Sequence, residues 1–297
     1  MKNLLSFAKE LRQSYTEKTP ESRTPDHLSE IKSIKIPSLH DDYDIPVDFY
    51  YPTNITDKNV PVIVFAHGGA FVSGDLQTHH VLAHTIAYET QSIVAYVDYR
   101  LSPEHPYPTG LNDYTSVIDW IYKNSDSLGI NPKKIALCGD SAGANLAATA
   151  SMVARDQLSV PIVAQWLIYL YMANTEANTN SWRELGDTYF PTKEVFTLSK
   201  EAYLPEEKNQ NLEYAAPLLG NHKNLPPALI QVGTLDPLID ENIKYNEVLQ
   251  NSGVESTIKV YENQVHGFIQ FFKNEKENPK GLEAVKDGIE FLNKIFH

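Results

Sequence analysis

The stretch CGDSAGANLA, residues 138–147, places Ser141 between two glycines at the junction of two different patterns. The apolar run KIALCGD predicts a strand before the serine, and the alanine-rich run SAGANLAATASMVA predicts a helix from the serine onward. Ser141 therefore stands at a strand-to-helix turn. Either it is the N-cap of the helix, or it is a nucleophile that its small neighbours leave accessible. Gly139 and Gly143 favour the nucleophile, because glycines at these positions keep neighbouring chains clear of the hydroxyl.

Strand-like runs and helical patterns alternate on both sides of this turn. Helices are expected at residues 79–90, 111–123, 141–155 and 240–251 and in the final LEAVKDGIEFLNKIF. Short apolar runs bounded by Pro, Gly, Asn or Asp predict the strands. They are SIKIPS (33–38), IPVDFYYP (45–52), VPVIVFAH (60–67), SIVAYVDY (92–99), KIALCGD (134–140), PIVAQWLIYL (161–170), PALIQVGT (227–234) and STIKVYEN (256–263). The last six look buried on both faces, as central parallel strands are.

This alternation predicts an α/β fold, with one domain over residues 1–297 and a mainly parallel central sheet flanked by helices. Two segments stand outside the alternation, at about residues 1–40 and about 172–215. The first begins with an amphipathic helix, and the second contains a helix at 192–202. We expect the two segments to form a helical cap over the carboxyl edge of the sheet, where ligands bind in open α/β sheets.

The composition is that of an ordinary globular protein, with 42% hydrophobic and 21% charged residues. The formal net charge of −13 argues against nucleic-acid binding, because an acidic surface repels phosphate backbones. Cys138 is the single cysteine, which excludes an intramolecular disulfide and fits a reducing, cytoplasmic location. We expect no signal peptide and no membrane span, because no apolar stretch is long enough.

A serine hydroxyl becomes a strong nucleophile only when a base takes its proton. His266 follows the last predicted strand and is the best candidate for that base. The imidazole in turn needs a carboxylate that fixes its tautomer. Asp236 follows the strand PALIQVGT, whereas its competitor Asp240 is expected in the first turn of the next helix. The chain order Ser141, Asp236, His266 is the order expected of an α/β-hydrolase.

A tetrahedral intermediate also needs hydrogen-bond donors for its oxyanion. The segment FAHGGAF, residues 65–71, ends the strand VPVIVFAH in a pair of glycines. We expect the backbone N–H groups of Gly68, Gly69 and Ala142 to be these donors. His67 is expected to anchor the loop structurally.

These motifs together resemble the hormone-sensitive-lipase-like family of α/β-hydrolase carboxylesterases, from about residue 60 to the end of the chain. HGGAF resembles the family's HGGG motif, DYRLSPEHPYP (98–108) its DYRLAPEHPFP segment, and GDSAGANLA its GDSAGGNLA motif. DPLIDE and HGF match its acid and base motifs. The resemblance implies an α/β-hydrolase fold with a cap, ester hydrolysis with a preference for short to medium acyl chains, and, as in many members, a homodimer formed through the sheet edge.

The sequence departs from the family pattern at two places. Ala70 replaces the third glycine of HGGG; we expect the oxyanion site to survive, because the first two glycines carry its donors, although the methyl group adds bulk beside the substrate. YMANTEANTNSW (171–182) stands where the family has a Tyr-Pro turn, which alters the cap and the pocket wall. In the DYRL segment we expect Asp98 and Arg100 to pair and to hold the loop beneath the nucleophile turn.

The sequence therefore predicts a hydrolase of small-molecule carboxylic esters that works through an acyl-enzyme and needs no metal or organic cofactor. His79, His80 and His84 represent the alternative of a metal site, but only Asp75 lies near them as a further ligand. An amidase, peptidase or lactonase that uses the same three residues remains an alternative. So does a non-catalytic small-molecule receptor on this scaffold, against which the presence of the catalytic histidine argues.

Overall fold

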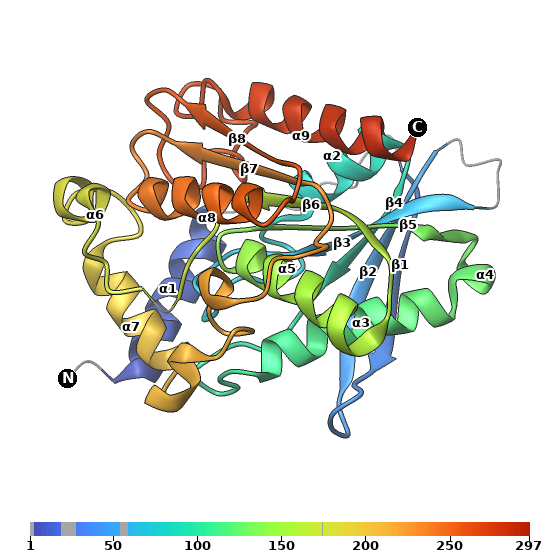
Figure 1. Cartoon of the computed structure of the whole chain (residues 1–297), viewed down its shortest axis with the longest axis horizontal. Helices are drawn as coiled ribbons and strands as arrows, with labels where there is room; N and C mark the ends of the chain where they lie inside the picture. Colours follow the sequence, from blue (N-terminus) through green and yellow to red (C-terminus); the bar gives the residue numbers. More distant parts are fainter. Residues whose placement is uncertain (1–2, 19–27, 54–58, 174) are drawn as a thin grey trace.

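The computed structural model describes residues 3–18, 28–53, 59–173 and 175–297. Within these residues one eight-stranded sheet runs through the molecule, in the order β1-β2-β4-β3-β5-β6-β7-β8 (Figure 1). The strands are β1 (Leu28–Pro37), β2 (Asp44–Pro52), β3 (Val60–Ala66), β4 (Ile93–Val97), β5 (Ile130–Asp140), β6 (Ile162–Ile168), β7 (Ala228–Gly233) and β8 (Ser256–Tyr261). β2 pairs antiparallel with β1 and β4, and all pairs among β3 to β8 are parallel. The mainly parallel sheet is confirmed.

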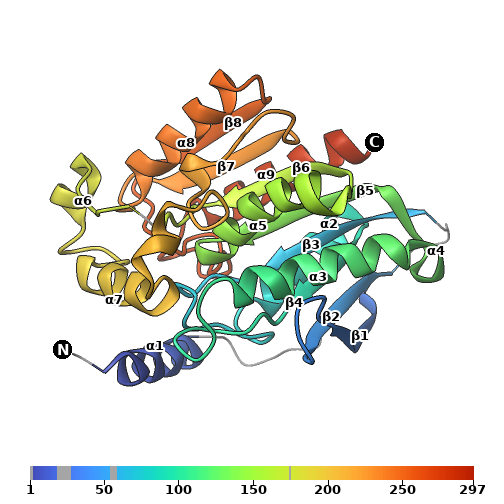
Figure 2. The same cartoon turned by 60° about the horizontal axis from the view of Figure 1, so that its bottom comes forward.

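Helices cover both faces of this sheet (Figures 1 and 2). α2 (His80–Thr90) and α9 (Gly281–Phe296) pack on one face, and α3 (Thr109–Lys123), α5 (Ala142–Val153) and α8 (Ile239–Asn251) pack on the other. All five were expected from the helical spacing. The shorter turns escaped it, because they span too few residues for a period to appear. They are α4 (Ser125–Leu128), a π-helical turn at Ala154–Leu158 and 3₁₀ turns at Glu207–Asn211 and Pro217–Leu219.

Strand β3 shows how the sheet divides the core in two. Successive side chains of a strand point to opposite faces. Val62 and Val64 belong to the apolar cluster under α3, α5 and α8, whereas Ile63 and Phe65 belong to the cluster under α2 and α9. Every residue of β3 after Val60 is buried, which explains its nearly continuous apolar sequence.

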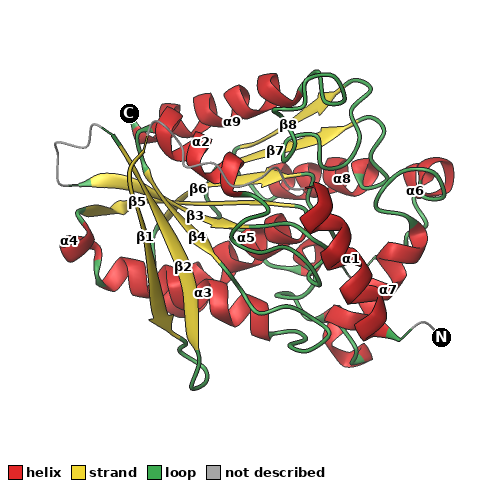
Figure 3. Cartoon of the chain, turned by 180° about the vertical axis from the view of Figure 1, so that it is seen from behind, coloured by secondary structure: helices red, strands yellow, loops and turns green. Residues whose placement is uncertain are grey.

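Three helices lie outside these layers, namely α1 (Leu4–Lys18), α6 (Asn180–Leu185) and α7 (Lys193–Tyr203). α1 and α7 lie side by side (Figure 3). They share an apolar cluster that includes Phe7 and Ala8 of α1 and Ala202 of α7. The same cluster contains Ala70 and Val72, from the loop that follows β3. In the part of the chain that the structure describes, no helix combines the length and the apolar character that crossing a membrane requires.

Two expectations about the ends of the sheet are wrong. The cap segment was expected to reach about residue 40, but Leu28–Pro37 form edge strand β1 and pair with β2, while residues 19–27 lie outside the described residues. Strand β8 was expected to be buried on both faces, but Thr257, Lys259 and Val260 are exposed. Its partner within the sheet is β7 alone, so β8 is the opposite edge and its sequence is not that of a central strand.

Candidate active site

Ser141 lies at a sharp turn between the end of β5 and the start of α5. Its φ of 54° and ψ of −116° put it in a backbone region that residues other than glycine rarely occupy. A Cβ on Gly139 would lie 2.4 Å from the backbone of Gly143, and a Cβ on Gly143 would lie 2.0 Å from the carbonyl oxygen of Ala66. Neighbouring chains approach so closely here that both positions require glycine.

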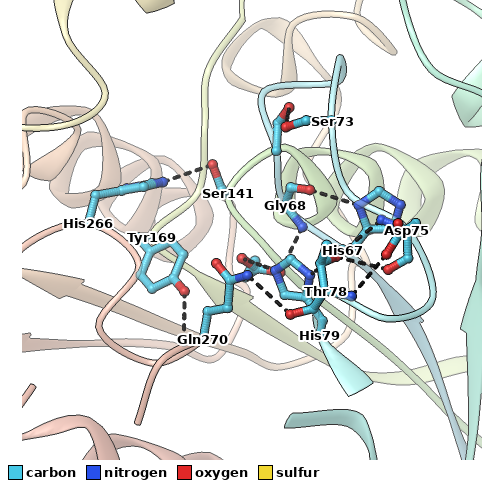
Figure 4. A network of polar contacts seen from close by, with 12 residues as sticks. His67, Gly68, Ser73, Asp75, Thr78, His79, Ser141, Tyr169, His266 and Gln270 are labelled. Atoms are coloured by element: carbon cyan, nitrogen blue, oxygen red, sulfur yellow. Dashed lines mark hydrogen bonds and ion pairs between the residues drawn. The ribbon is translucent and has the colours of Figure 1, made fainter. Parts of the chain in front are cut away.

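The side chain of Ser141 resolves the choice between a cap and an accessible hydroxyl. Ser141 occupies the N-cap position of α5, but its side chain makes no capping hydrogen bond. Its Oγ lies instead 2.9 Å from Nε2 of His266, in the loop after β8 (Figure 4). Nδ1 of His266 lies 2.7 Å from Oδ2 of Asp236, in the loop after β7. Three side chains from three strand ends therefore form one continuous series of hydrogen bonds.

The surroundings of Asp236 set the direction of these hydrogen bonds. Asp236 is fully buried, and its Oδ1 accepts the N–H of Leu238 at 2.9 Å. The second oxygen of this carboxylate accepts from Nδ1 of His266, so Nε2 faces the hydroxyl of Ser141 as an acceptor. This is the tautomer in which an imidazole takes a proton from a serine.

Asp240, the competing carboxylate, lies in the first turn of α8, as expected. Its Oδ2 accepts the backbone N–H of Ser181 at 2.9 Å, and the hydroxyl of Ser181 donates to the carbonyl of Pro237 at 2.7 Å. Asp240 therefore attaches the start of α6 to the loop that carries Asp236, and it makes no contact with His266.

Gly68 does not have the role expected of it. Its backbone N–H donates to Oδ1 of Asp140 at 2.8 Å, so this N–H is not available to an oxyanion. A Cβ on Gly68 would lie 2.5 Å from Oδ2 of Asp140, which explains the glycine. Gly68 therefore ties the loop after β3 to the nucleophile turn, because Asp140 directly precedes Ser141.

The two following N–H groups, of Gly69 and Ala70, have no hydrogen-bond acceptor among the described residues. Gly69 has a φ of 120° and Ala70 a φ of 54°, so the chain turns sharply at this point. Ala142 is the first residue of α5, where no carbonyl of the helix accepts its N–H. Ala70 stands where the family has a third glycine. Its methyl group belongs to the apolar cluster with Phe7 of α1, so the extra methyl packs against α1.

A buried polar network supports Gly68 from behind (Figure 4). Oδ2 of Asp140 lies 3.2 Å from Nε2 of His79, and Nδ1 of His79 lies 2.9 Å from Oγ1 of Thr78. Gln270 donates to the carbonyl of Thr78 at 3.3 Å, and its own N–H donates to the hydroxyl of Tyr169 at 3.1 Å. Burial raises the pKa of Asp140, but the charge and hydrogen bond of His79 outweigh it, so the pKa lies below its usual value and the carboxylate stays ionised.

The network gives Asp140 and His79 roles that the sequence did not indicate. Asp140 was visible only as the second residue of the GDSAG motif, and His79 only as a candidate metal ligand. His80, its neighbour, points elsewhere, with Nδ1 2.8 Å from the hydroxyl of Tyr50. Within the described ranges no group of three or more His, Cys, Asp and Glu side chains is arranged to hold a metal ion.

His67 anchors the loop after β3, as the sequence predicted. Its ring stacks on Tyr99 with centroids 4.4 Å apart, and Nδ1 donates to the carbonyl of Gly68 at 2.7 Å. The hydroxyl of Tyr99 donates to the carbonyl of His67 at 2.8 Å. Burial, reinforced by nearby His79, lowers the pKa of His67 to about 4, so the ring is neutral at physiological pH.

The expected pair of Asp98 and Arg100 is wrong. Arg100 binds Asp113 of α3, with Nη2 to Oδ1 at 2.7 Å, and also Asp41, with Nη1 to Oδ2 at 2.8 Å. The backbone N–H of Arg100 adds a further bond to Asp113. The arginine therefore joins α3 to the β1–β2 connection rather than to its neighbour in the sequence.

Two aromatic rings flank the imidazole of His266, and the sequence singled out neither. The ring of Tyr169, at the end of β6, has its centroid 4.5 Å from that of His266. The ring of Phe190, from the 172–215 segment, has its centroid 5.8 Å from that of His266. Phe190 is 36% exposed, unlike the buried Tyr169, so its ring is open to contact with a small molecule bound beside His266.

Comparison with known proteins places this geometry among esterases. A family model described as alpha/beta hydrolase fold matches residues 63–270. Carboxylesterase NlhH of Mycobacterium tuberculosis is 34% identical over 284 residues, which cover 94% of this chain and 86% of that protein. An arylesterase of Saccharolobus solfataricus is 30% identical over 277 residues, which cover 90% and 87%. The crystal structure of EstE1, a thermostable carboxylesterase from a metagenomic library, aligns with a TM-score of 0.91 at 29% identity and covers 99% of this chain and 98% of that one.

Proposed function

The chain belongs to the alpha/beta hydrolase family, among its hormone-sensitive-lipase-like carboxylesterases, and from this premise we propose that it hydrolyses carboxylic esters through Ser141, His266 and Asp236. The observation that carries the proposal is the unbroken series of hydrogen bonds from Oγ of Ser141 through the imidazole to the buried carboxylate. Both distances are those of hydrogen bonds, and the one between Ser141 and His266 is short enough for the imidazole to take the proton of the hydroxyl.

In the proposed reaction, Oγ of Ser141 attacks the ester carbonyl while Nε2 of His266 takes its proton. Asp236 holds the tautomer and stabilises the imidazolium that forms. His266 then protonates the leaving alcohol, and an acyl-enzyme remains on Ser141. Water, deprotonated by the same histidine, hydrolyses this acyl-enzyme and restores the free serine.

The oxyanion of the tetrahedral intermediate needs donors that the protein itself does not use. We assign this role to the N–H groups of Gly69, Ala70 and Ala142, with Ala70 in place of Gly68. The assignment is supported by the unpartnered N–H groups of Gly69 and Ala70, and by the helix start at Ala142, where the dipole of α5 favours negative charge. Losing one such donor costs roughly 3 kcal/mol of activation free energy.

We further propose that α1, α6 and α7 together form the cap, and that the substrate is an ester with a short to medium acyl chain. The position of α1 and α7 against the loop that carries Gly69 and Ala70 supports the cap. The half-exposed ring of Phe190 beside His266 supports an apolar group on the alcohol side of the substrate. A homodimer formed through the open edge of β8 is the proposed assembly, and sedimentation of the purified protein tests it.

A panel of p-nitrophenyl esters of increasing acyl length tests the proposed reaction, with Ser141→Ala as the blank. We expect saturable turnover that falls for long acyl chains, and none above background for the variant. A fluorophosphonate probe should label the wild type at Ser141, as mapped by peptide mass spectrometry. Labelling at another residue, or full activity of the folded variant, contradicts the proposal.

A further inference from the structure

One arginine of α1 binds the loop that carries the proposed oxyanion donors. Nε of Arg12 donates to the carbonyl of Val72 at 2.8 Å, and Nη2 donates to the carbonyl of Ser102 at 3.2 Å. Nη1 and Nη2 also bind the two oxygens of Glu104, each at 2.8 Å. Planar guanidinium groups make such paired contacts with carboxylates, which fixes their orientation. Arg12 thus connects α1 with two loops that follow β3 and β4.

Val72 ends the turn in which Gly69 and Ala70 lie. The carbonyl of Gly69 accepts the N–H groups of Val72 at 3.0 Å and of Ser73 at 2.9 Å. On the outside of the turn, the carbonyl of Phe71 accepts the N–H of Ser102 at 2.9 Å. The carbonyls of Phe71 and Val72 are therefore held from outside, the first by the loop after β4 and the second by Arg12.

The backbone of this turn needs such external contacts. Ala70 and Phe71 have φ values of 54° and 64°, in the left-handed region that side chains disfavour. A strained backbone persists only where its surroundings determine it. Here α1 makes two separate contacts with the turn. Arg12 binds the carbonyl of Val72, and Phe7 shares an apolar cluster with Ala70.

We propose that Arg12 is a positioning residue, which holds the Gly69–Ala70 turn in the conformation that stabilises the oxyanion. This proposal rests on the proposed ester hydrolysis and extends it. It also gives a function to the segment DYRLSPEHPYP, whose Glu104 is the docking point of α1 through Arg12. Because the bond is made to the turn itself, its loss should weaken binding of the transition state more than binding of the ester.

The test compares Arg12→Met, Arg12→Lys and Glu104→Gln with the wild type on one short p-nitrophenyl ester. Arg155→Met is the matched control, because Arg155 also binds a carboxylate, that of Asp156, and two backbone carbonyls, but it lies in the Ala154–Leu158 turn outside the proposed cap. Circular dichroism and thermal denaturation establish that each variant is folded. A trifluoromethyl ketone, which adds to the serine as a tetrahedral oxyanion, reports on transition-state binding.

For Arg12→Met we expect kcat to fall by roughly ten- to a hundred-fold with KM nearly unchanged, since a small misplacement of groups around the reacting centre has effects of that size. The affinity for the ketone should fall in parallel with kcat/KM. Arg12→Lys and Glu104→Gln should lose less, because Lys keeps one donor and Gln keeps an acceptor. Arg155→Met should match the wild type in kcat and KM.

An unchanged kcat in folded Arg12→Met overturns the proposal, and so does a rise in KM alone, which would make α1 a simple substrate contact. If Arg12→Met does not fold, Arg12→Lys and Glu104→Gln decide the question by the same two criteria. Failure of the proposed function looks different, since the wild type itself would then not turn over the ester or would not be labelled at Ser141.

Discussion

The side chain of Asp140 holds the backbone N–H of Gly68 at 2.8 Å, although the two residues are 72 positions apart. Asp140 ends β5 and Gly68 follows β3, and these two strands are neighbours in the sheet. Since Ser141 comes directly after Asp140, one carboxylate sets the distance between the nucleophile and the turn that carries Gly69 and Ala70. The bond is deeply buried, and His79 pairs with the second oxygen of the carboxylate.

Replacing Asp140 should therefore impair catalysis and stability together. Asp140→Ala leaves the buried N–H of Gly68 and the buried Nε2 of His79 without a partner, and each such loss costs about 1–3 kcal/mol. Asp140→Asn keeps an oxygen for Gly68 but loses the charge, so its effect should be smaller. Steady-state kinetics and thermal denaturation should rank kcat and Tm as wild type, Asn, Ala. A wild-type kcat for the Ala variant would show that Gly68 needs no anchor.

Asp236, in the loop after β7, and Asp240, in the first turn of α8, should differ sharply in their effect on activity. Asp236→Asn should lower kcat by roughly a thousand-fold or more, because the amide no longer stabilises the imidazolium or its tautomer. Asp240→Asn should change kcat little, because Asp240 accepts the N–H of Ser181 rather than contacting His266. Rates at saturating ester check this. Equal losses would mean that the carboxylate paired with His266 has been assigned wrongly.

Phe190 should select for the alcohol group of the ester. In the proposed mechanism His266 protonates the leaving alcohol, so we expect the ring of Phe190, next to this histidine, to face the alcohol side of the substrate. Phe190→Ala should lower kcat/KM for benzyl acetate by roughly ten-fold, as expected for loss of an aromatic contact, and leave ethyl acetate nearly unchanged. Phe190→Leu, which keeps the apolar area, should lie between. An equal loss of kcat/KM on both esters would show that Phe190 does not contact the alcohol group.

Glu241 makes the stability of the folded protein depend on pH. It is 3% exposed, and its Oε1 accepts the indole N–H of Trp182 from α6 at 3.2 Å. Burial raises its pKa to about 7, well above the value of 4.5 for a free side chain, and the charges of Asp236 and Asp240 add to the effect. Between these two pH values the folded protein keeps a proton that the unfolded chain has lost. Raising the pH through this window therefore destabilises the fold, by up to roughly 3 kcal/mol above pH 7.

Glu241→Gln removes this titration and keeps an acceptor for Trp182. Its Tm should be close to that of the wild type at pH 5 and several degrees higher at pH 8. Glu247→Gln is the control, because Glu247 lies on the same helix but is exposed and paired with Lys244. Thermal scans across pH measure the difference. A Glu241→Gln advantage that does not grow with pH would show that Glu241 is already ionised in the folded state.

Local sequence patterns were enough to predict much of the architecture. Every expected strand and helix exists. A run such as VPVIVFAH is almost entirely apolar, and this composition alone predicts a buried strand. β8 shows the limit of this reasoning. STIKVYEN is as rich in β-branched residues as the preceding strands. Its position at the edge of the sheet could not be predicted from this run, because it depends on where the other strands lie.

The catalytic candidates were predictable for a related reason. Ser141, Asp236 and His266 each follow a strand of a parallel sheet, and the carboxyl ends of such strands meet at one edge. The sequence also shows the two glycines that the turn at Ser141 requires. The bond of Gly68 to Asp140 could not be read in the same way, because the partner of a backbone N–H depends on which strand lies alongside.

The sequence by itself determined the strand-to-helix turn at Ser141, the order of the elements and the kinds of side chain at the strand ends, because these follow from local composition and spacing. Tertiary structure alone decided which groups bind one another: Arg100 with Asp113 rather than Asp98, Asp140 with Gly68, and Arg12 with Glu104. Hydrogen bonds and ion pairs act over a few ångströms of space, and residues far apart in the chain come within that distance only once the sheet is assembled.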